Sequence, residues 1–176
     1  VAIGREALKS NTTGANNTAV GYQSLYNNTT GITSTAVGYQ AGYYSVTGYV
    51  TAVGAYAGQT AATVGVDAFG YKAAQNTTGD NNVAIGTNAL ATNTSGSSNT
   101  ALGKTALYSS TTGSNNTAVG YQAGYSQTTG SDNTFVGYQA GQGLTTGQYN
   151  VAIGRTAMSG AAVTGSQNNA IGSTDL

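Results

Sequence analysis

The chain has 176 residues, among them 27 glycines, and it contains no proline, cysteine, histidine or tryptophan. Its five basic and five acidic residues give a formal net charge of zero at pH 7. The lack of cysteine excludes a disulfide scaffold, and the lack of a basic cluster argues against nucleic acid, whose phosphates require concentrated Lys and Arg. No apolar run approaches the roughly 20 residues of a membrane-spanning helix, so we expect no membrane insertion by this segment.

A repeat of 16 to 18 residues runs through the whole chain. NTAVGYQAG at 116–124, for example, returns as NTFVGYQAG at 133–141. Each copy has a glycine after a small and an apolar residue, and we call these the marker glycines: Gly4, Gly21, Gly38, Gly54, Gly70, Gly86, Gly103, Gly120, Gly137, Gly154 and Gly172. A fixed period of this size is typical of solenoids, so we expect one repetitive domain over residues 1–176. Because the chain opens at VAIG, in mid-repeat, we also expect it to be a fragment of a longer fibre protein.

In chain order, the first predicted element of each copy is a short strand that leads into the marker glycine. The residue before the glycine is Ile, Val, Leu or Phe, and the residue before that is Ala in ten copies, with Phe135 as the exception. Successive residues of a strand point to opposite faces, so bulky side chains should face one surface and alanines another. We expect the narrow alanine face to meet sister chains, which predicts an oligomer and in particular a side-by-side homotrimer.

The second predicted element is a turn. NTTG occurs at 11–14 and 76–79, NNTTG at 27–31, and TTG at 111–113, 128–130 and 145–147. Asn and Gly tolerate positive φ and Thr hydroxyls can bond nearby backbone, so we expect each turn to lead into a second short strand. Residues 55–70 lack the TTG, which predicts a distorted coil there. Together the elements predict an all-β parallel β-solenoid of about eleven coils.

Identical residues at a fixed period should stack into rows at the spacing of paired strands. The predicted structural rows are the marker glycines and the asparagines four positions before them: Asn17, Asn82, Asn99, Asn116, Asn133, Asn150 and Asn168. A third row follows the marker glycines and is a candidate contact stripe: Tyr22, Tyr39, Tyr71, Tyr121 and Tyr138. Tyr26, Tyr43, Tyr108 and Tyr125 join it four residues later. We interpret the rings mainly as structural, with carbohydrate binding as the alternative.

Four stretches carry a resemblance to a known family: NNVAIG at 81–86, YNVAIG at 149–154, and NNTAVG at 16–21 and 115–120. They resemble the YadA-like head repeats of trimeric autotransporter adhesins, and the NTAVGYQA form also resembles repeats of phage tail-fibre proteins. The resemblance implies a left-handed parallel β-roll in which three chains associate side by side on a surface and mediate attachment. This chain departs from the pattern in its longer coils, in the absence of an anchor or stalk, and in a Thr where the motif has Val: Thr18, Thr35, Thr51, Thr100, Thr117 and Thr134.

Catalytic motifs find little support. GKT at 103–105 would need a glycine at Ser98 to complete a phosphate-binding loop, and GQG at 141–143 lacks the later glycine of a dinucleotide fingerprint. The acids occupy different places in their units: Glu6, Asp67, Asp80, Asp132 and Asp175. Without His or Cys, nucleophile and zinc sites have almost no candidates. We therefore expect no enzyme, no cofactor and no metal site.

The sequence predicts a structural and adhesive fibre segment, on a virion as part of a tail fibre or on a bacterial cell surface. The Tyr-Gln form of the repeat favours the tail fibre, and an adhesin head is the alternative. A cell-surface glycan or protein is the expected receptor. Two further alternatives are a carbohydrate-processing solenoid and an ice-binding solenoid, the latter because a regular threonine row could order water: Thr13, Thr30, Thr78, Thr112, Thr129 and Thr146.

Overall fold

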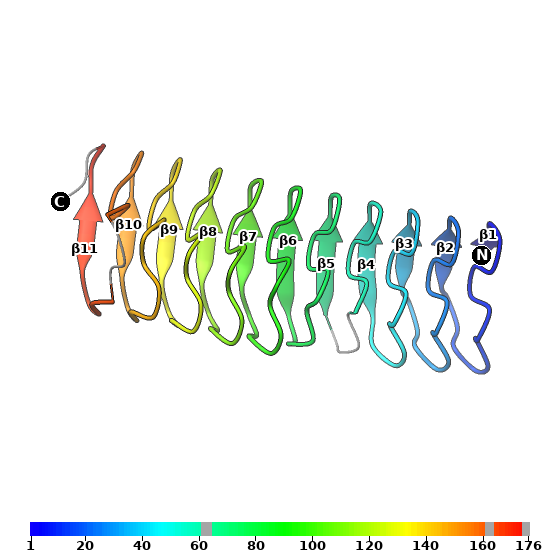
Figure 1. The fold of residues 1–176 in the computed structure, drawn as a ribbon. Coiled ribbons are helices and arrows are strands. Elements are labelled where there is room, and N and C mark those ends of the chain that lie inside the picture. The colour runs from blue at the N-terminus through cyan, green and yellow to red at the C-terminus, as the bar shows by residue number, and fades with distance from the viewer. Residues whose placement is uncertain (61–64, 161–163, 174–176) are drawn as a thin grey trace.

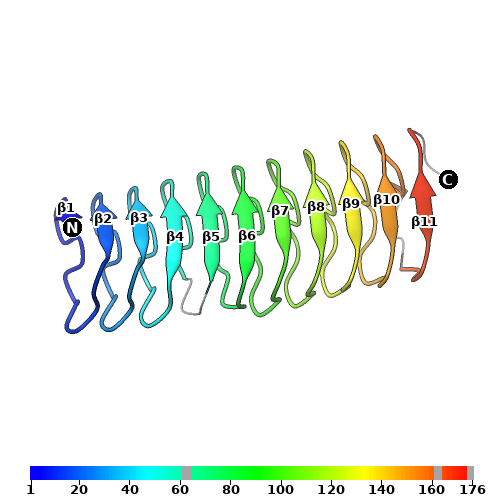
Figure 2. The ribbon, with the colours of Figure 1, turned by 180° about the vertical axis from the view of Figure 1, so that it is seen from behind.

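The computed structural model describes residues 1–60, 65–160 and 164–173. Eleven strands, one per repeat, form a single parallel sheet in the order of the sequence. They are β1 (Ala2–Ile3), β2 (Thr18–Val20), β3 (Thr35–Val37), β4 (Val50–Val53), β5 (Val66–Phe69), β6 (Asn82–Ile85), β7 (Thr100–Leu102), β8 (Thr117–Val119), β9 (Thr134–Val136), β10 (Val151–Ile153) and β11 (Asn169–Ile171). Each strand is followed by a turn and a return segment, so the coils lie in a row with the two termini at opposite ends (Figures 1 and 2). The predicted all-β parallel solenoid is confirmed.

The strands pair in the register that the repeat predicts. Ala19 lies opposite Ala36, and Val20 lies opposite Val37. The same alignment of equivalent residues holds through every pair of neighbouring strands. At a strand spacing of about 4.8 Å, the ten steps from β1 to β11 span about 48 Å.

The predicted second strand of each coil is wrong for the described residues, which contain one strand per coil. After the marker glycine, alternate residues adopt positive φ, for example Gln23 at 53° and Leu25 at 48°. Such angles are incompatible with a strand, yet the segment still bonds to both neighbouring coils. The Gln23 N–H donates to the Arg5 carbonyl at 3.0 Å, and the Leu25 N–H donates to the Ala41 carbonyl at 3.0 Å. The second side of the solenoid is therefore a stack of hydrogen-bonded turns.

The alanines of the strands face the inside of the coil. Ala19, Ala152 and the equivalent alanines of the strands between them are completely buried within the single chain. They pack with leucines and alanines from the turn side, such as Leu25, in one continuous core. The prediction that alanines contact sister chains is therefore wrong. A coil of about 17 residues has a narrow interior, and small side chains let its two sides approach closely.

Phe135 replaces the strand alanine in β9, and two glycines make room for its ring. A Cβ added to Gly124 would lie 2.6 Å from Cδ2 of Phe135, and one added to Gly141 would lie 2.2 Å from Cδ1. Other coils have leucine at this place on the turn side, as at Leu107. In β9 the Phe135 ring therefore fills the space that a leucine on the turn fills elsewhere, and the core stays packed.

The marker glycines form the predicted column. Gly103 has φ of +143°, and a Cβ on it would lie 2.2 Å from the carbonyl oxygen of Gly120 in the next coil. Both the backbone conformation and the close approach of the coils exclude a side chain here.

The coil predicted to be distorted keeps its strand register. Val50 lies opposite Val66, and Phe69 lies opposite Ile85. The part of the predicted distortion that falls on residues 61–64 lies outside the described residues.

Candidate functional site

The asparagines form a hydrogen-bonded row along one inner corner, which is buried except at its last member, Asn168. From Asn99 to Asn168, each side-chain amide donates to Oδ1 of the asparagine in the preceding coil, which for Asn99 is Asn82, at 2.9–3.2 Å. The backbone N–H of the donating residue bonds the same oxygen, as at Asn116 and Asn99 at 3.0 Å. Every Oδ1 between two coils therefore accepts two hydrogen bonds, which locks each coil to the one before it.

A glycine three positions before each asparagine belongs to the same network, and the sequence analysis missed this role. Asn116 also donates to the carbonyl of Gly130 at 3.0 Å, and Asn133 donates to Gly147 at 2.9 Å. The Gly-x-x-Asn spacing recurs in the sequence and could have revealed the link. Each asparagine at the start of a strand therefore bonds to the turn that precedes the following strand, as Asn116 before β8 bonds to Gly130 before β9.

The row is interrupted in the first half of the rod. Ser34 occupies this place in the coil after Asn17, and its backbone N–H donates to Asn17 at 2.8 Å. Val50 and Val66 occupy the same place in the two coils after Ser34. Both valines are buried. The structure therefore brings six of the seven predicted asparagines into one row and places Asn17 apart from them.

The first threonine of the turn closes the corner from one coil to the next. The hydroxyl of Thr94 donates to the Thr111 carbonyl at 3.0 Å, and Thr111 donates to Thr128 at 3.1 Å. The second threonines, proposed as an ice-binding row, lie exposed beside them at Thr30, Thr112 and Thr129. Ice binding stays a prediction, which a thermal-hysteresis assay tests.

The predicted tyrosine stripe divides into two groups. Tyr22 and Tyr39 stack at 5.2 Å between ring centroids, and Tyr121 and Tyr138 stack at 5.3 Å. Tyr71 joins the first group through Tyr56, to which it packs edge-on at 6.1 Å. The sequence analysis missed Tyr56, which stands one residue later in its coil but fills the same row. Thr87 and Lys104 separate the two groups.

Cations cover ring faces at the ends of these groups. Arg5 lies over Tyr22 at 5.9 Å and Arg155 lies over Tyr138 at 5.9 Å, while Lys72 lies over Tyr71 at 5.4 Å. Such contacts stiffen the rod, since each stacked pair or cation–π contact contributes about 0.5–1 kcal/mol.

Glutamines beside the tyrosines form a second amide row. Gln40 donates to Gln23 at 2.8 Å and Gln59 donates to Gln40 at 3.0 Å. Glu6 ends this row, since Gln23 donates to its Oε2 at 2.7 Å. Hydrogen bonds from Lys9 and Gln23 lower the pKa of the Glu6 carboxyl.

The lowered pKa of Glu6 predicts an acid dependence of stability. Glu6 as carboxylate stabilises the rod above its ordinary pKa of 4.5, and this contribution is lost as the pH falls through the lowered pKa. Thermal unfolding of the wild type and of Glu6→Gln, measured between pH 7 and 3, should show a smaller acid loss in the variant. Equal losses in both proteins would contradict the assigned role.

The outer face of the sheet carries an uncovered apolar row. Its members are the residues before the marker glycines, and the exposed fraction is 37–43% for Val37, Phe69, Ile85, Leu102 and Ile153. The residues two positions earlier in each strand form a second row on this face. This row is mostly threonine, and in β5 it holds Asp67. The bulky residues predicted for one strand face thus lie outside, in a line that follows the whole sheet.

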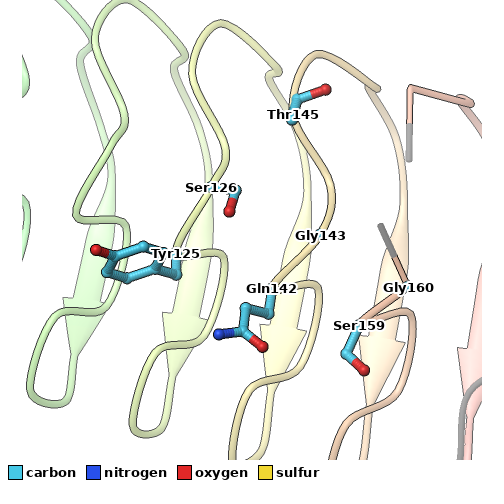
Figure 3. Close-up of a pocket in the computed structure, with 7 residues that line it drawn as sticks. All are labelled: Tyr125, Ser126, Gln142, Gly143, Thr145, Ser159 and Gly160. Atoms are coloured by element: carbon cyan, nitrogen blue, oxygen red, sulfur yellow. The ribbon is translucent and has the colours of Figure 1, made fainter. Parts of the chain in front are cut away.

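A shallow hollow of about 450 Å³ lies on the turn side of the last coils (Figure 3). Tyr125 and Ser126 from the segment between β8 and β9 line one end, and Ser159 and Gly160 from the segment between β10 and β11 line the other. Gln142 and Gly143 lie between them, with Thr145 at the rim.

The described acids do not form a cluster. Asp67 lies on the outer sheet face, and Asp132 accepts a hydrogen bond from Asn115 on the corner at 3.1 Å. Asp175 lies outside the described residues. Within the described ranges, no group of three or more His, Cys, Asp or Glu could hold a metal ion. The same residues contain no helix that is long and apolar enough to cross a membrane.

Fold and surface together define the class of this protein as a parallel β-solenoid repeat protein of about ten turns of about 17 residues. No protein-family model matches the chain, and no curated protein or solved structure matches it significantly.

Proposed function

We propose that this chain is a structural and adhesive fibre segment, part of a phage tail fibre, in which three chains associate side by side. The observation that carries the proposal is the uncovered apolar row on a straight eleven-stranded sheet. Monomeric proteins rarely expose a continuous apolar patch of this length, and such patches usually mark an interface. The resemblance of NTAVGYQA at 116–123 to tail-fibre repeats supports the same use.

The outer sheet face replaces the alanine face as the contact surface of the proposed trimer. Leu102 lies near the middle of the apolar row, between Ile85 and Val119 in the neighbouring strands. Three copies of the row around one axis would bury these side chains together. A left-handed winding is the other feature that the family resemblance implies, and it stays a prediction.

Substitution of Leu102 by lysine should separate the chains. The site is 43% exposed in the single chain, so the lysine stem can lie along the sheet without disturbing the coil. In a trimer it would place three like charges near one axis, which costs several kcal/mol and weakens association more than about 100-fold. Analytical ultracentrifugation should give three times the 17.4 kDa chain mass for the wild type and the single mass for the variant.

Thr112→Lys is the matched control, because Thr112 is exposed in the turn between β7 and β8 and is not part of the apolar row. It should leave the trimer intact. A wild-type chain that sediments as a stable monomer at micromolar concentration would remove the assembly part of the proposal.

The adhesive part of the proposal requires a direct test. Beads coated with the trimer should attach to bacterial cells that carry the receptor, and many weak contacts along the rod would act together through multivalency. The alternative owner is a bacterial cell with an adhesin head. The coding sequence beyond residue 176 separates them, since an outer-membrane anchor indicates the adhesin and a self-cleaving fibre chaperone domain indicates the phage.

The proposed function includes no catalysis. Glycan cleavage that is lost on substitution of Glu6, Asp67, Asp80 or Asp132 would instead support the solenoid-enzyme alternative.

A further inference from the structure

We infer that the hollow between Tyr125 and Ser159 binds a short neutral saccharide. The inference deepens the proposed attachment function, on which its biological use rests, by naming the ligand class and the place of contact.

Side-chain size decreases stepwise along two adjacent rows at the hollow. In the first row, Tyr108 and Tyr125 are followed by Gln142 and Ser159. In the second row, Ser109 and Ser126 are followed by Gly143 and Gly160. In the second row the backbone carbonyl of Gly160 takes the place that a side chain at Gly143 would occupy. The depression that Figure 3 shows between Tyr125 and Ser159 therefore follows from the smaller side chains of the first row.

Tyr125 supplies an aromatic ring that is stacked on one side. It packs on Tyr108 with a centroid distance of 5.4 Å and an interplanar angle of 8°. The next side chain of the row is Gln142, whose amide donates to Gln122 at 3.2 Å. Gln142 is therefore held toward Gln122, and the ring of Tyr125 borders the hollow. The ring face of a tyrosine suits the apolar C–H face of a pyranose.

The remaining lining is polar and uncharged. Ser126, Thr145 and Ser159 contribute hydroxyl groups, which both donate and accept hydrogen bonds, and Gln142 contributes an amide. Among the described residues that line the hollow, none is Asp, Glu, Lys or Arg. An aromatic ring beside uncharged polar groups matches a neutral sugar better than an anionic sugar or a charged peptide.

The experiment is a titration of the wild-type chain with neutral di- to tetrasaccharides of glucose, galactose and N-acetylglucosamine, followed by NMR. At least one saccharide should shift signals of Tyr125, Ser126 and Gln142, and carboxylated or sulfated analogues should bind no more tightly. Tyr125→Ala should weaken binding by about tenfold or more. Gln142→Tyr should abolish saccharide binding. The new ring would stack on Tyr125, as Tyr43 stacks on Tyr26, and would fill the hollow.

Tyr26→Ala is the matched control, since Tyr26 is a stacked ring of the same row near the other end of the rod. It should leave saccharide binding unchanged. No signal shift at the hollow with any neutral saccharide at millimolar concentration would overturn the inference, as would an equal loss of binding in Tyr26→Ala.

Cell attachment is measured separately with the same proteins. If Gln142→Tyr loses saccharide binding but still attaches to cells, the hollow is not the attachment site, and the proposed fibre function stands. If the wild type binds saccharide but attaches to no cell, the proposed function fails and the binding site stands.

Discussion

Replacing Phe135 by alanine should lower the free energy of unfolding by about 3–5 kcal/mol, the usual cost of removing a fully buried phenylalanine ring. The ring has no exposed surface, and Gly124 and Gly141 on the facing turns have no side chains that could fill the space. The cavity would therefore stay open. Chemical denaturation followed by circular dichroism measures the loss, and Tyr138→Ala on the exposed surface of the same coil is the control.

A compensating change makes this prediction sharper. Gly141→Leu alone should also destabilise the rod, because its Cβ would already lie 2.2 Å from the ring of Phe135. Phe135→Ala together with Gly141→Leu restores the arrangement of coil β7, where Ala101 faces Leu107. Leu107 has φ of 48°, so leucine tolerates the positive φ of this place. The double variant should be more stable than either single variant, whereas additive losses would show that the two residues do not share one space.

Replacing Asn116 by alanine should cost about 3 kcal/mol or more, because one side chain carries four hydrogen bonds in a buried corner. Its amide donates to Asn99 and Gly130, and its Oδ1 accepts from the backbone N–H and the amide of Asn133. Without it the Asn133 N–H loses its acceptor. In Asn116→Ala, the backbone N–H of Asn133 should exchange faster with solvent, and the midpoint of chemical denaturation should fall.

Asn168→Ala provides the matched control for Asn116. Asn168 is the same residue type in the same row, but it is exposed, and among the described residues its side chain bonds only to Oδ1 of Asn150. Its backbone N–H donates to the same oxygen and would remain in the variant. Its loss should cost about 1 kcal/mol or less. Similar losses at Asn116 and Asn168 would mean that the row contributes nothing beyond ordinary surface hydrogen bonds.

The repeat predicted the fold well because a fixed period determines strand order and register directly. Strand alternation also separated Ala from Val, but it did not show which of them faces inward. Phe135 carried that information, since the large residue on the strand coincides with glycines at 124 and 141 on the turns, as expected if the strand and the turns share one interior. The signal requires comparing the position two residues before each marker glycine with the position four residues after it, in the same coil and in the coil before, which no local pattern reveals.

The predicted second strand failed because composition does not encode backbone dihedral angles. Gln23 and Leu25 are ordinary residues at positive φ, held there by hydrogen bonds to both neighbouring coils. The hollow was also beyond prediction from one copy of the repeat. It depends on the decrease in side-chain size from Tyr125 to Ser159 across three coils, and on the stacking of these coils in space.

Stacking of one coil per strand spacing is the central claim, and pulsed electron paramagnetic resonance tests it most directly. The chain has no native cysteine, so spin labels can be placed at exposed corner threonines in pairs: Thr30 with Thr112, Thr30 with Thr146, and Thr13 with Thr146. These pairs are five, seven and eight coils apart, and labelled chains would be diluted with unlabelled ones. The account predicts backbone separations of about 24, 34 and 38 Å, which rise by about 4.8 Å per coil. Distances that do not increase with the number of intervening coils would contradict it.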